Sequence, residues 1–147
     1  MFPNSKVDVF LQTTTVTNGG TTTAKLDTLG ADFVMIDVVS TTANNATNNP
    51  SVFKLSESDD TYYSNSADIT AFVGDGAGGW TVPNWPTATT GVLSVKFNVD
   101  ARHRKRYLFL TISPLLSQDF TGVANLFALE RSAVNTTDAN VIALVSG

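Results

Sequence analysis

The chain has 147 residues, of which 42% are apolar and 15% charged, with nine Lys and Arg, thirteen Asp and Glu, and a formal net charge of −4. This apolar share excludes a disordered chain, and the length predicts a single domain over residues 1–147. The acidic balance argues against nucleic acid as a partner, and the absence of Cys excludes disulfides, a thiolate nucleophile and Cys-ligated metals.

Residues 1–6 lack a basic region followed by an apolar one, so we expect no export through a secretory signal peptide. No apolar run approaches the roughly 18 residues of a membrane-spanning helix. We therefore expect no membrane among the partners.

Apolar and polar residues alternate with a period of two along much of the chain, which is typical of β-strands. This pattern predicts a strand over 6–11, followed by a hairpin turn at 18–20 between two Thr-rich runs. Residues 33–39 are apolar on both faces apart from Asp37. They predict a central strand that is covered on both sides.

The middle of the chain is rich in turn-forming residues. Residues 41–50 hold four Asn and a Pro and predict a loop, 52–58 predict a short strand, and 59–61 predict a turn. The Gly-rich stretch 74–79 predicts a flexible loop that continues to residue 86.

The strongest alternation lies on either side of a basic segment, residues 102–106. Residues 93–99 and 107–112 predict two strands that pair around this segment as a hairpin. Their apolar side chains are expected to form the central core: Leu93, Val95, Phe97, Leu108, Leu110 and Ile112. Residues 123–130 have helical propensity but alternate, so we predict a strand there and a last strand at 140–145.

Roughly eight short strands joined by Gly, Asn and Pro turns predict an all-β fold. The expected architecture is a single-domain antiparallel β-sandwich or jelly-roll-like barrel. A Gly- and Trp-rich loop insert is expected at about 74–90.

Two patterns suggest catalysis or cofactor binding, and neither is convincing. Gly74, Gly76 and Gly79 match the spacing of a dinucleotide-binding turn, but the Trp- and Pro-rich residues that follow cannot begin the helix that this site requires. His103 is the sole histidine, and its four cationic neighbours disfavour the imidazolium needed for Ser-His chemistry. We expect no catalytic residues, no cofactor and no enzyme activity.

Acidic residues at 57–60 could bind a hard cation through carboxylate oxygens. Glu57, Asp59 and Asp60 lie close together, and Asp75 is a further donor after folding. The stretch lacks the ligand spacing and Gly turn of a Ca²⁺ loop, and acidic turn residues are common without metal. We expect no metal site.

Four aromatic residues lie in predicted loops. They are Tyr62, Tyr63, Trp80 and Trp85. Loop aromatics either stack on sugars or fill pockets on a protein partner, or they plug the open ends of a sandwich. The sequence leaves both interpretations open, with Trp80 and Trp85 as candidate contact residues.

The basic segment carries four of the nine Lys and Arg residues. Arg102, Arg104 and Lys105 are candidate contacts to an acidic protein surface, because Arg pairs with carboxylates in a bidentate manner. The alternative is a solvated hairpin tip whose charges are balanced by Asp100, Glu130 or other acids. Arg106 opens the next strand, and we expect an acidic partner to hold it.

Three stretches together resemble the capsid decoration, or cement, proteins of tailed bacteriophages. They are a Thr-rich opening with the apolar strand at 31–39, the stretch 53–60 followed by 67–70, and the strand–turn–strand at 99–108. The insert at 74–90 lies outside this pattern.

The resemblance implies a β-sandwich that binds the outer surface of an icosahedral phage head and stabilises it without catalysis. It implies the major capsid protein as partner, self-association on the capsid as a further contact, synthesis in the host bacterial cytoplasm and a final location on the virion exterior. The alternative from another class is a carbohydrate-binding or adhesin module, which would use Trp80, Trp85 and the tyrosines.

Overall fold

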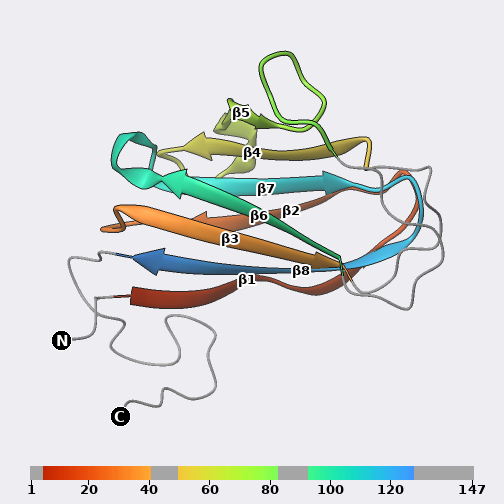
Figure 1. The fold of residues 1–147 in the computed structure, drawn as a ribbon, viewed down its shortest axis with the longest axis horizontal. Coiled ribbons are helices and arrows are strands. Elements are labelled where there is room, and N and C mark those ends of the chain that lie inside the picture. Colours follow the sequence, from red (N-terminus) through yellow and green to blue (C-terminus); the bar gives the residue numbers. More distant parts are fainter. Residues whose placement is uncertain (1–4, 41–49, 83–92, 128–147) are drawn as a thin grey trace, which may run out of the picture.

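The computed structural model describes residues 5–40, 50–82 and 93–127, apart from the side chain of Leu93. Eight strands and two short 3-10 helices occupy this part of the chain: β1 (Ser5–Val16), β2 (Thr22–Asp27), β3 (Phe33–Ser40), β4 (Val52–Ser58), η1 (Tyr63–Asn65), β5 (Ala67–Val73), β6 (Leu93–Asp100), η2 (Ala101–His103), β7 (Tyr107–Ser113) and β8 (Gln118–Phe127). They form two antiparallel four-stranded sheets in the orders β1-β8-β3-β6 and β2-β7-β4-β5, packed face to face (Figure 1). The predicted all-β sandwich is confirmed.

The core lies between the two sheets. Fully buried apolar side chains come from both of them, among them Ile36, Phe53, Leu55, Leu108, Leu110, Ile112, Phe120 and Leu126. Each contributes about 1.5–3 kcal/mol through removal of its apolar surface from water. Of the six predicted core residues, Phe97, Leu108, Leu110 and Ile112 are buried and Val95 is partly buried, while the side chain of Leu93 lies outside the described residues.

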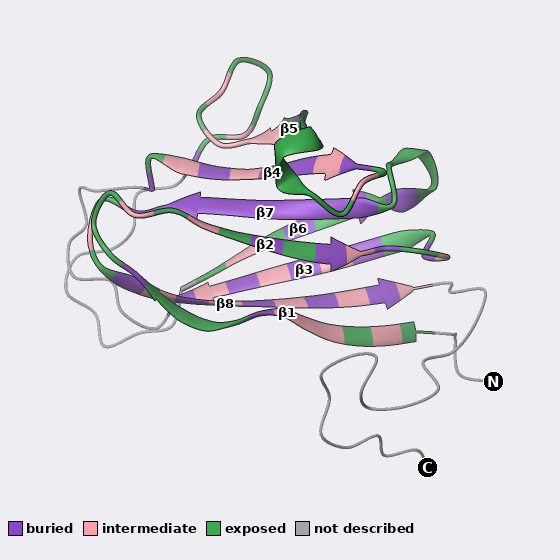
Figure 2. Ribbon diagram, turned by 180° about the vertical axis from the view of Figure 1, so that it is seen from behind, coloured by how far each residue is buried: buried purple, intermediate pink, exposed green. Residues whose placement is uncertain are grey.

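The strand β7 is buried along its whole length, as its two apolar faces predict (Figure 2). It lies between β2 and β4, and its inward face fills the core. The outward face is also covered, because the Tyr63 ring packs on Phe109 with 5.8 Å between centroids and Lys25 lies over the Tyr107 ring.

The strand β3 is central, as predicted, but it is not covered on both sides. It lies between β8 and β6, and Val34, Ile36 and Val38 are buried. The residues between them are partly or fully accessible, and Phe33 is 44% exposed. The prediction of a doubly covered strand is wrong, because the outward-facing side chains of β3 stay accessible, and Phe33 remains 44% exposed although Arg102 lies over its ring.

The prediction of two hairpins is also wrong. The strands on either side of the basic segment belong to different sheets, since β6 pairs with β3 whereas β7 pairs with β2 and β4. Likewise, β1 pairs with β8 and β2 with β7, so the turn at 18–20 passes from one sheet to the other. Alternation shows which residues face the core, but it does not identify the partner strand.

Two further strands differ from the expectation. The strand β8 runs from Gln118 to Phe127, which resolves the helix-or-strand ambiguity in favour of a strand for its described part. The strand β5 was not predicted, because its alternation is weak and it lies at a sheet edge. The predicted loop at 41–50, except for Pro50, and the predicted strand at 140–145 lie outside the described residues. Within the described chain, no helix has the length and apolarity needed to cross a membrane.

Candidate functional site

Three segments distant in sequence meet at one end of the sandwich, at the left in Figure 1. They are the loop 28–32 between β2 and β3, the end of β4 with its following turn, and the basic segment. Backbone hydrogen bonds join the first and third: the Thr28 amide donates to the Arg106 carbonyl (2.9 Å), and the Ala101 amide donates to the Asp32 carbonyl (2.8 Å). Main-chain contacts therefore fix the loop 28–32 beside the basic segment, and the end of β4 joins them through the side chains of Glu57 and Asp59.

Asp100, the residue that caps the start of η2, holds the Arg102 side chain in place. The Asp100 carboxylate accepts the Arg102 amide hydrogen at 3.2 Å and binds the guanidinium through Nε at 2.9 Å and Nη2 at 2.6 Å. The hydrogen bonding of the Arg102 guanidinium, which has the largest effect, and that of the Arg102 amide lower the pKa of Asp100 to about 2. The same guanidinium lies over the Phe33 ring, 4.7 Å from its centroid, which is a cation–π contact.

Arg104 and Lys105 both contact Glu57, at the end of β4. Arg104 Nη1 lies 3.4 Å from Glu57 Oε1, and the Lys105 amide donates to Oε2 at 3.1 Å. In the described part of the chain, the Lys105 ammonium has no acidic partner. Lys105 therefore presents its charge to solvent.

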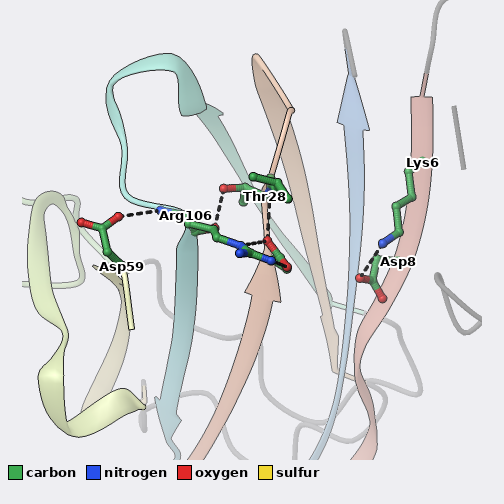
Figure 3. Close-up of polar contacts among 7 residues, drawn as sticks. Lys6, Asp8, Thr28, Asp59 and Arg106 are labelled. Carbon is green, nitrogen blue, oxygen red and sulfur yellow. Dashed lines mark hydrogen bonds and ion pairs between the residues drawn. The ribbon is translucent and has the colours of Figure 1, made fainter. Parts of the chain in front are cut away.

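Arg106 has the most extensive contacts. Its guanidinium binds Asp27 through Nε at 3.0 Å and Nη2 at 2.8 Å, and its amide donates to Asp59 Oδ1 at 3.3 Å. The Thr28 hydroxyl donates to its carbonyl at 2.7 Å (Figure 3). Partial burial alone would raise the pKa of Asp27, but the Arg106 guanidinium and the Leu29 amide outweigh burial and lower it. The predicted acidic partner of Arg106 is confirmed.

Between the loop 28–32 and the basic segment lies an open pocket of about 290 Å³. We call it the arginine pocket. Its lining residues are Thr28, Leu29, Gly30, Ala31, Asp32, Ala101, Arg102, Arg104 and Arg106. Two apolar side chains border this region, Leu29 (66% exposed) and Phe33 (44% exposed). Sequence reasoning missed the contribution of 28–32. The available clue was an apolar residue, Leu29, between the turn-forming residues Thr28 and Gly30.

The structure bears on one of the two interpretations of the basic segment, the local balance of its charges. The segment is not a hairpin tip, but its charges are balanced locally: Asp100, Glu57 and Asp27 pair with Arg102, Arg104 and Arg106. Asp100 is thus a confirmed partner, whereas Glu130 lies outside the described residues. The role of Arg102, Arg104 and Lys105 as contacts to another protein remains a prediction.

The candidate cation ligands are occupied by donors from the chain itself. Glu57 and Asp59 accept hydrogen bonds from the basic segment, and Asp60 accepts from the Asn65 side chain at 2.7 Å. Asp75 accepts from the Val82 amide and does not join them. Among the described residues, no group of three or more acidic or His side chains is arranged to hold a metal ion.

Trp80 packs into the sandwich. Its ring meets Phe53 and Phe97 edge-on, with centroids 5.5 and 5.4 Å apart, and Phe97 also contacts Phe72. Trp80 Nε1 donates to the Phe72 carbonyl at 3.3 Å. We call these four residues the aromatic plug, because they close the gap between the edge strands β5 and β6. This placement favours the plugging interpretation for Trp80, while Trp85 lies outside the described residues.

The Gly-rich stretch brings Trp80 back to the core. The amides of Asp75 and Trp80 bond to the carbonyls of Trp80 and Val73 (2.8 and 3.2 Å), and Gly79 approaches Val73 so closely that a Cβ would lie 1.9 Å from its oxygen. Residues 74–80 thus form a hydrogen-bonded turn, and the flexibility that we expected of this loop stays a prediction. Among the described residues that follow the glycines, Trp80 forms an isolated bridge with Gly74, and residues 80–82 are not helical.

The remaining candidates are exposed. Tyr62 is 69% exposed, whereas Tyr63 is partly covered by its contact with Phe109. His103 ends η2 at the surface, and no side-chain hydrogen bond or ion pair joins it to another described residue. No nucleophile–base pair involving His103 is therefore formed within the described chain.

The chain was compared with protein-family models and with curated proteins, and it matches none of them.

Proposed function

We propose that this protein is a non-enzymatic virion protein that binds the outer surface of an icosahedral phage head and stabilises it. The observation that carries the proposal is the surface at the arginine pocket. There, exposed Leu29 and Phe33 lie beside three arginines. Arg and aromatic residues are enriched at protein–protein contacts, where an apolar anchor is surrounded by polar groups.

The placement of the stretches that resemble decoration proteins supports the same proposal. The stretch 53–60 contacts 99–108 through Glu57 and Asp59, and the stretch 31–39 contacts it through the Asp32 carbonyl. The stretches that resemble decoration proteins thus lie together on one surface.

The physical logic of the function is multivalency. Many copies that each bridge neighbouring capsid subunits weakly add up to strong attachment, and each bridge stabilises the closed shell by binding it and not its opened form. The major capsid protein is the proposed partner, with contacts between copies of this chain on the capsid as an addition. The proposed location is the virion exterior.

The test is co-sedimentation with phage heads that lack this protein. A variant in which Arg102, Arg104 and Lys105 are all replaced by Ala should bind more weakly than the native chain and should show less dependence on salt. Lys96→Ala is the matched control, because it removes an exposed charge on β6 outside the pocket. Native-like binding of the triple variant at low and high salt would contradict docking through this surface.

The carbohydrate-binding alternative has less support. Trp80, one of its main candidates, belongs to the aromatic plug, which leaves Tyr62 as the most exposed described aromatic residue. A glycan-binding assay on Tyr62→Ala is therefore the appropriate test of that alternative. Loss of glycan binding in this variant, with its fold retained, would favour it over capsid attachment.

A further inference from the structure

We infer that the arginine pocket binds a single carboxylate side chain of a protein partner, flanked by apolar residues, and that Arg104 is its principal ligand. This inference rests on the proposed function, because it names the chemistry of the capsid surface that the protein would recognise. It depends on three features of the pocket: its unused donors, its surroundings and its rigidity.

The three guanidiniums differ in the donors that they leave free. Arg102 and Arg106 each present an Nε and an Nη2 hydrogen to a carboxylate of their own chain, Asp100 and Asp27. Among the described residues, the Arg104 guanidinium makes a single long contact, through Nη1, 3.4 Å from Glu57. A guanidinium has five donors, so the edge of Arg104 formed by Nε and Nη2 remains available. Its two parallel N–H groups can bind a carboxylate in a bidentate manner.

The environment of Arg104 strengthens such a contact. Its side chain is 34% exposed, the least of the three arginines that line the pocket. Charge-assisted hydrogen bonds are stronger where water is partly excluded. The pocket lining carries three cations and one acid, Asp32, so the immediate surroundings of a bound anion are positive.

The outer surroundings select the kind of ligand. Asp27, Glu57, Asp59 and Asp100 lie around the pocket and pair with the basic segment. A nucleic acid or another extended polyanion would bring phosphates close to these carboxylates, and the repulsion would oppose binding. A single carboxylate avoids that repulsion. The exposed Leu29 and Phe33 offer apolar contacts to the residues beside it.

The pocket is also preorganised. The loop 28–32 is fixed to the basic segment by the Thr28 and Ala101 hydrogen bonds, and the Asp32 amide donates to the Phe127 carbonyl at 3.1 Å. Asp100 and Asp27 fix the neighbouring guanidiniums from the outer side. Binding therefore requires little ordering of the site, and less free energy is lost to conformational entropy.

The experiment is a titration followed by NMR. The probes are the peptide acetyl-Leu-Glu-Leu-amide and its uncharged counterpart acetyl-Leu-Gln-Leu-amide, with inorganic phosphate and an oligothymidylate as alternative anions. The amides of Gly30 and Ala101 report on the pocket. The Glu peptide should shift these signals and the Arg104 Nε–H signal saturably, with a dissociation constant on the order of 1 mM for so few contacts. The Gln peptide should shift them little.

Variants of the protein test whether Arg104 is the side chain that binds the Glu peptide. Arg104→Ala should weaken binding of the Glu peptide about tenfold or more, and Arg104→Lys should restore it only in part, because Lys lacks the bidentate edge. Lys96→Ala is the matched control: it removes an exposed charge on β6 outside the pocket lining and should bind the Glu peptide like the native chain. Unchanged amide signals away from the pocket would show that each variant is folded.

Several outcomes would overturn the inference: equal shifts with the Gln peptide, tighter binding of phosphate or oligothymidylate than of the Glu peptide, or native-like binding by Arg104→Ala. The same variants are then tested on phage heads. If the native chain does not bind heads, the proposed function fails, and the peptide titration alone tests whether the pocket binds a carboxylate. If heads bind the native chain and the Arg104→Ala variant equally, the pocket is not the capsid contact and the inference fails while the proposed function stands.

Discussion

The Trp80 ring lies edge-on to the Phe97 ring, with 5.4 Å between centroids and 85° between planes. Phe97 belongs to β6, at the edge of one sheet, and Trp80 follows β5, at the edge of the other. The pair therefore joins the β6 edge of one sheet to the β5 edge of the other.

Phe97→Ala should lower the free energy of unfolding by roughly 3–5 kcal/mol, because Phe97 is 4% exposed and its removal leaves a cavity among aromatic rings. Urea denaturation followed by circular dichroism measures the change. Val95→Ala, at a partly buried position of the same strand, should cost less. A loss below about 1 kcal/mol for Phe97→Ala would contradict the burial of this ring.

Trp80→Ala should be destabilising by roughly 2–4 kcal/mol, since the indole fills the space between β5 and β6. Trp80→Phe should retain more of the stability, because a smaller ring still contacts Phe53 and Phe97. Thermal unfolding of both variants provides the measurement. If Trp80→Ala melted like the native chain but lost binding to a ligand, Trp80 would be a contact residue and the plugging interpretation would fail.

Gly79→Ala should be far more destabilising than Gly19→Ala. A Cβ at Gly79 would lie 1.9 Å from the Val73 carbonyl oxygen, which forces the turn open. Gly19 has a positive φ of 71° but nothing within 4 Å of its Cβ position. Gly19→Ala should therefore cost only about 1–2 kcal/mol, the strain of placing a residue with a Cβ in left-handed backbone. Equal melting temperatures for the two variants would show that residues 74–80 do not form the turn described.

Stability should fall as the pH decreases from about 4 to 2, in part through Asp100. Its folded pKa of about 2 lies below its ordinary value of 3.8, so its contribution is present above pH 4 and is lost as the pH falls through the folded pKa. Asp100→Asn should therefore lower the melting temperature at pH 7, and the difference from the native chain should shrink near pH 2. Arg102→Ala should show the same pH dependence. A difference that stays constant across this range would rule out the pairing as its source.

Arg106→Ala should lower the melting temperature more than Arg102→Ala. Arg102 pairs with Asp100 two residues away, whereas Arg106 joins β7 to Asp27 on β2, and its guanidinium also lies 4.8 Å from the centroid of Tyr107. Both guanidiniums lie over a ring, Phe33 for Arg102 and Tyr107 for Arg106, so the expected difference comes from the ion pairs: an exposed local pair contributes little to stability, whereas the Arg106 pair fastens the start of β7 to β2. Differential scanning calorimetry of both variants tests the order, and the reverse order would contradict it.

Much of the fold follows from the alternation of side chains. The strands at 52–58 and 107–112, and the inward-facing Phe97, Leu108, Leu110 and Ile112, are evident from a period of two, because burial of one strand face requires that pattern. The acidic partner expected for Arg106 was likewise evident, since a cation at a strand end that is held against the sheet needs a carboxylate.

The partners of each strand, and hence the site, required the tertiary structure. The six residues between β6 and β7 can end a hairpin or cross between sheets, and alternation is identical in both cases. The arginine pocket exists because this connection crosses between the sheets and meets the loop 28–32 from β2. Asp27 and Glu57 pair with the basic segment from distant positions along the chain, and long-range packing sets those distances, whereas Asp100 lies only two residues from Arg102. Sequence thus determined the strands and the charges, and the packing of the two sheets decided which charges meet.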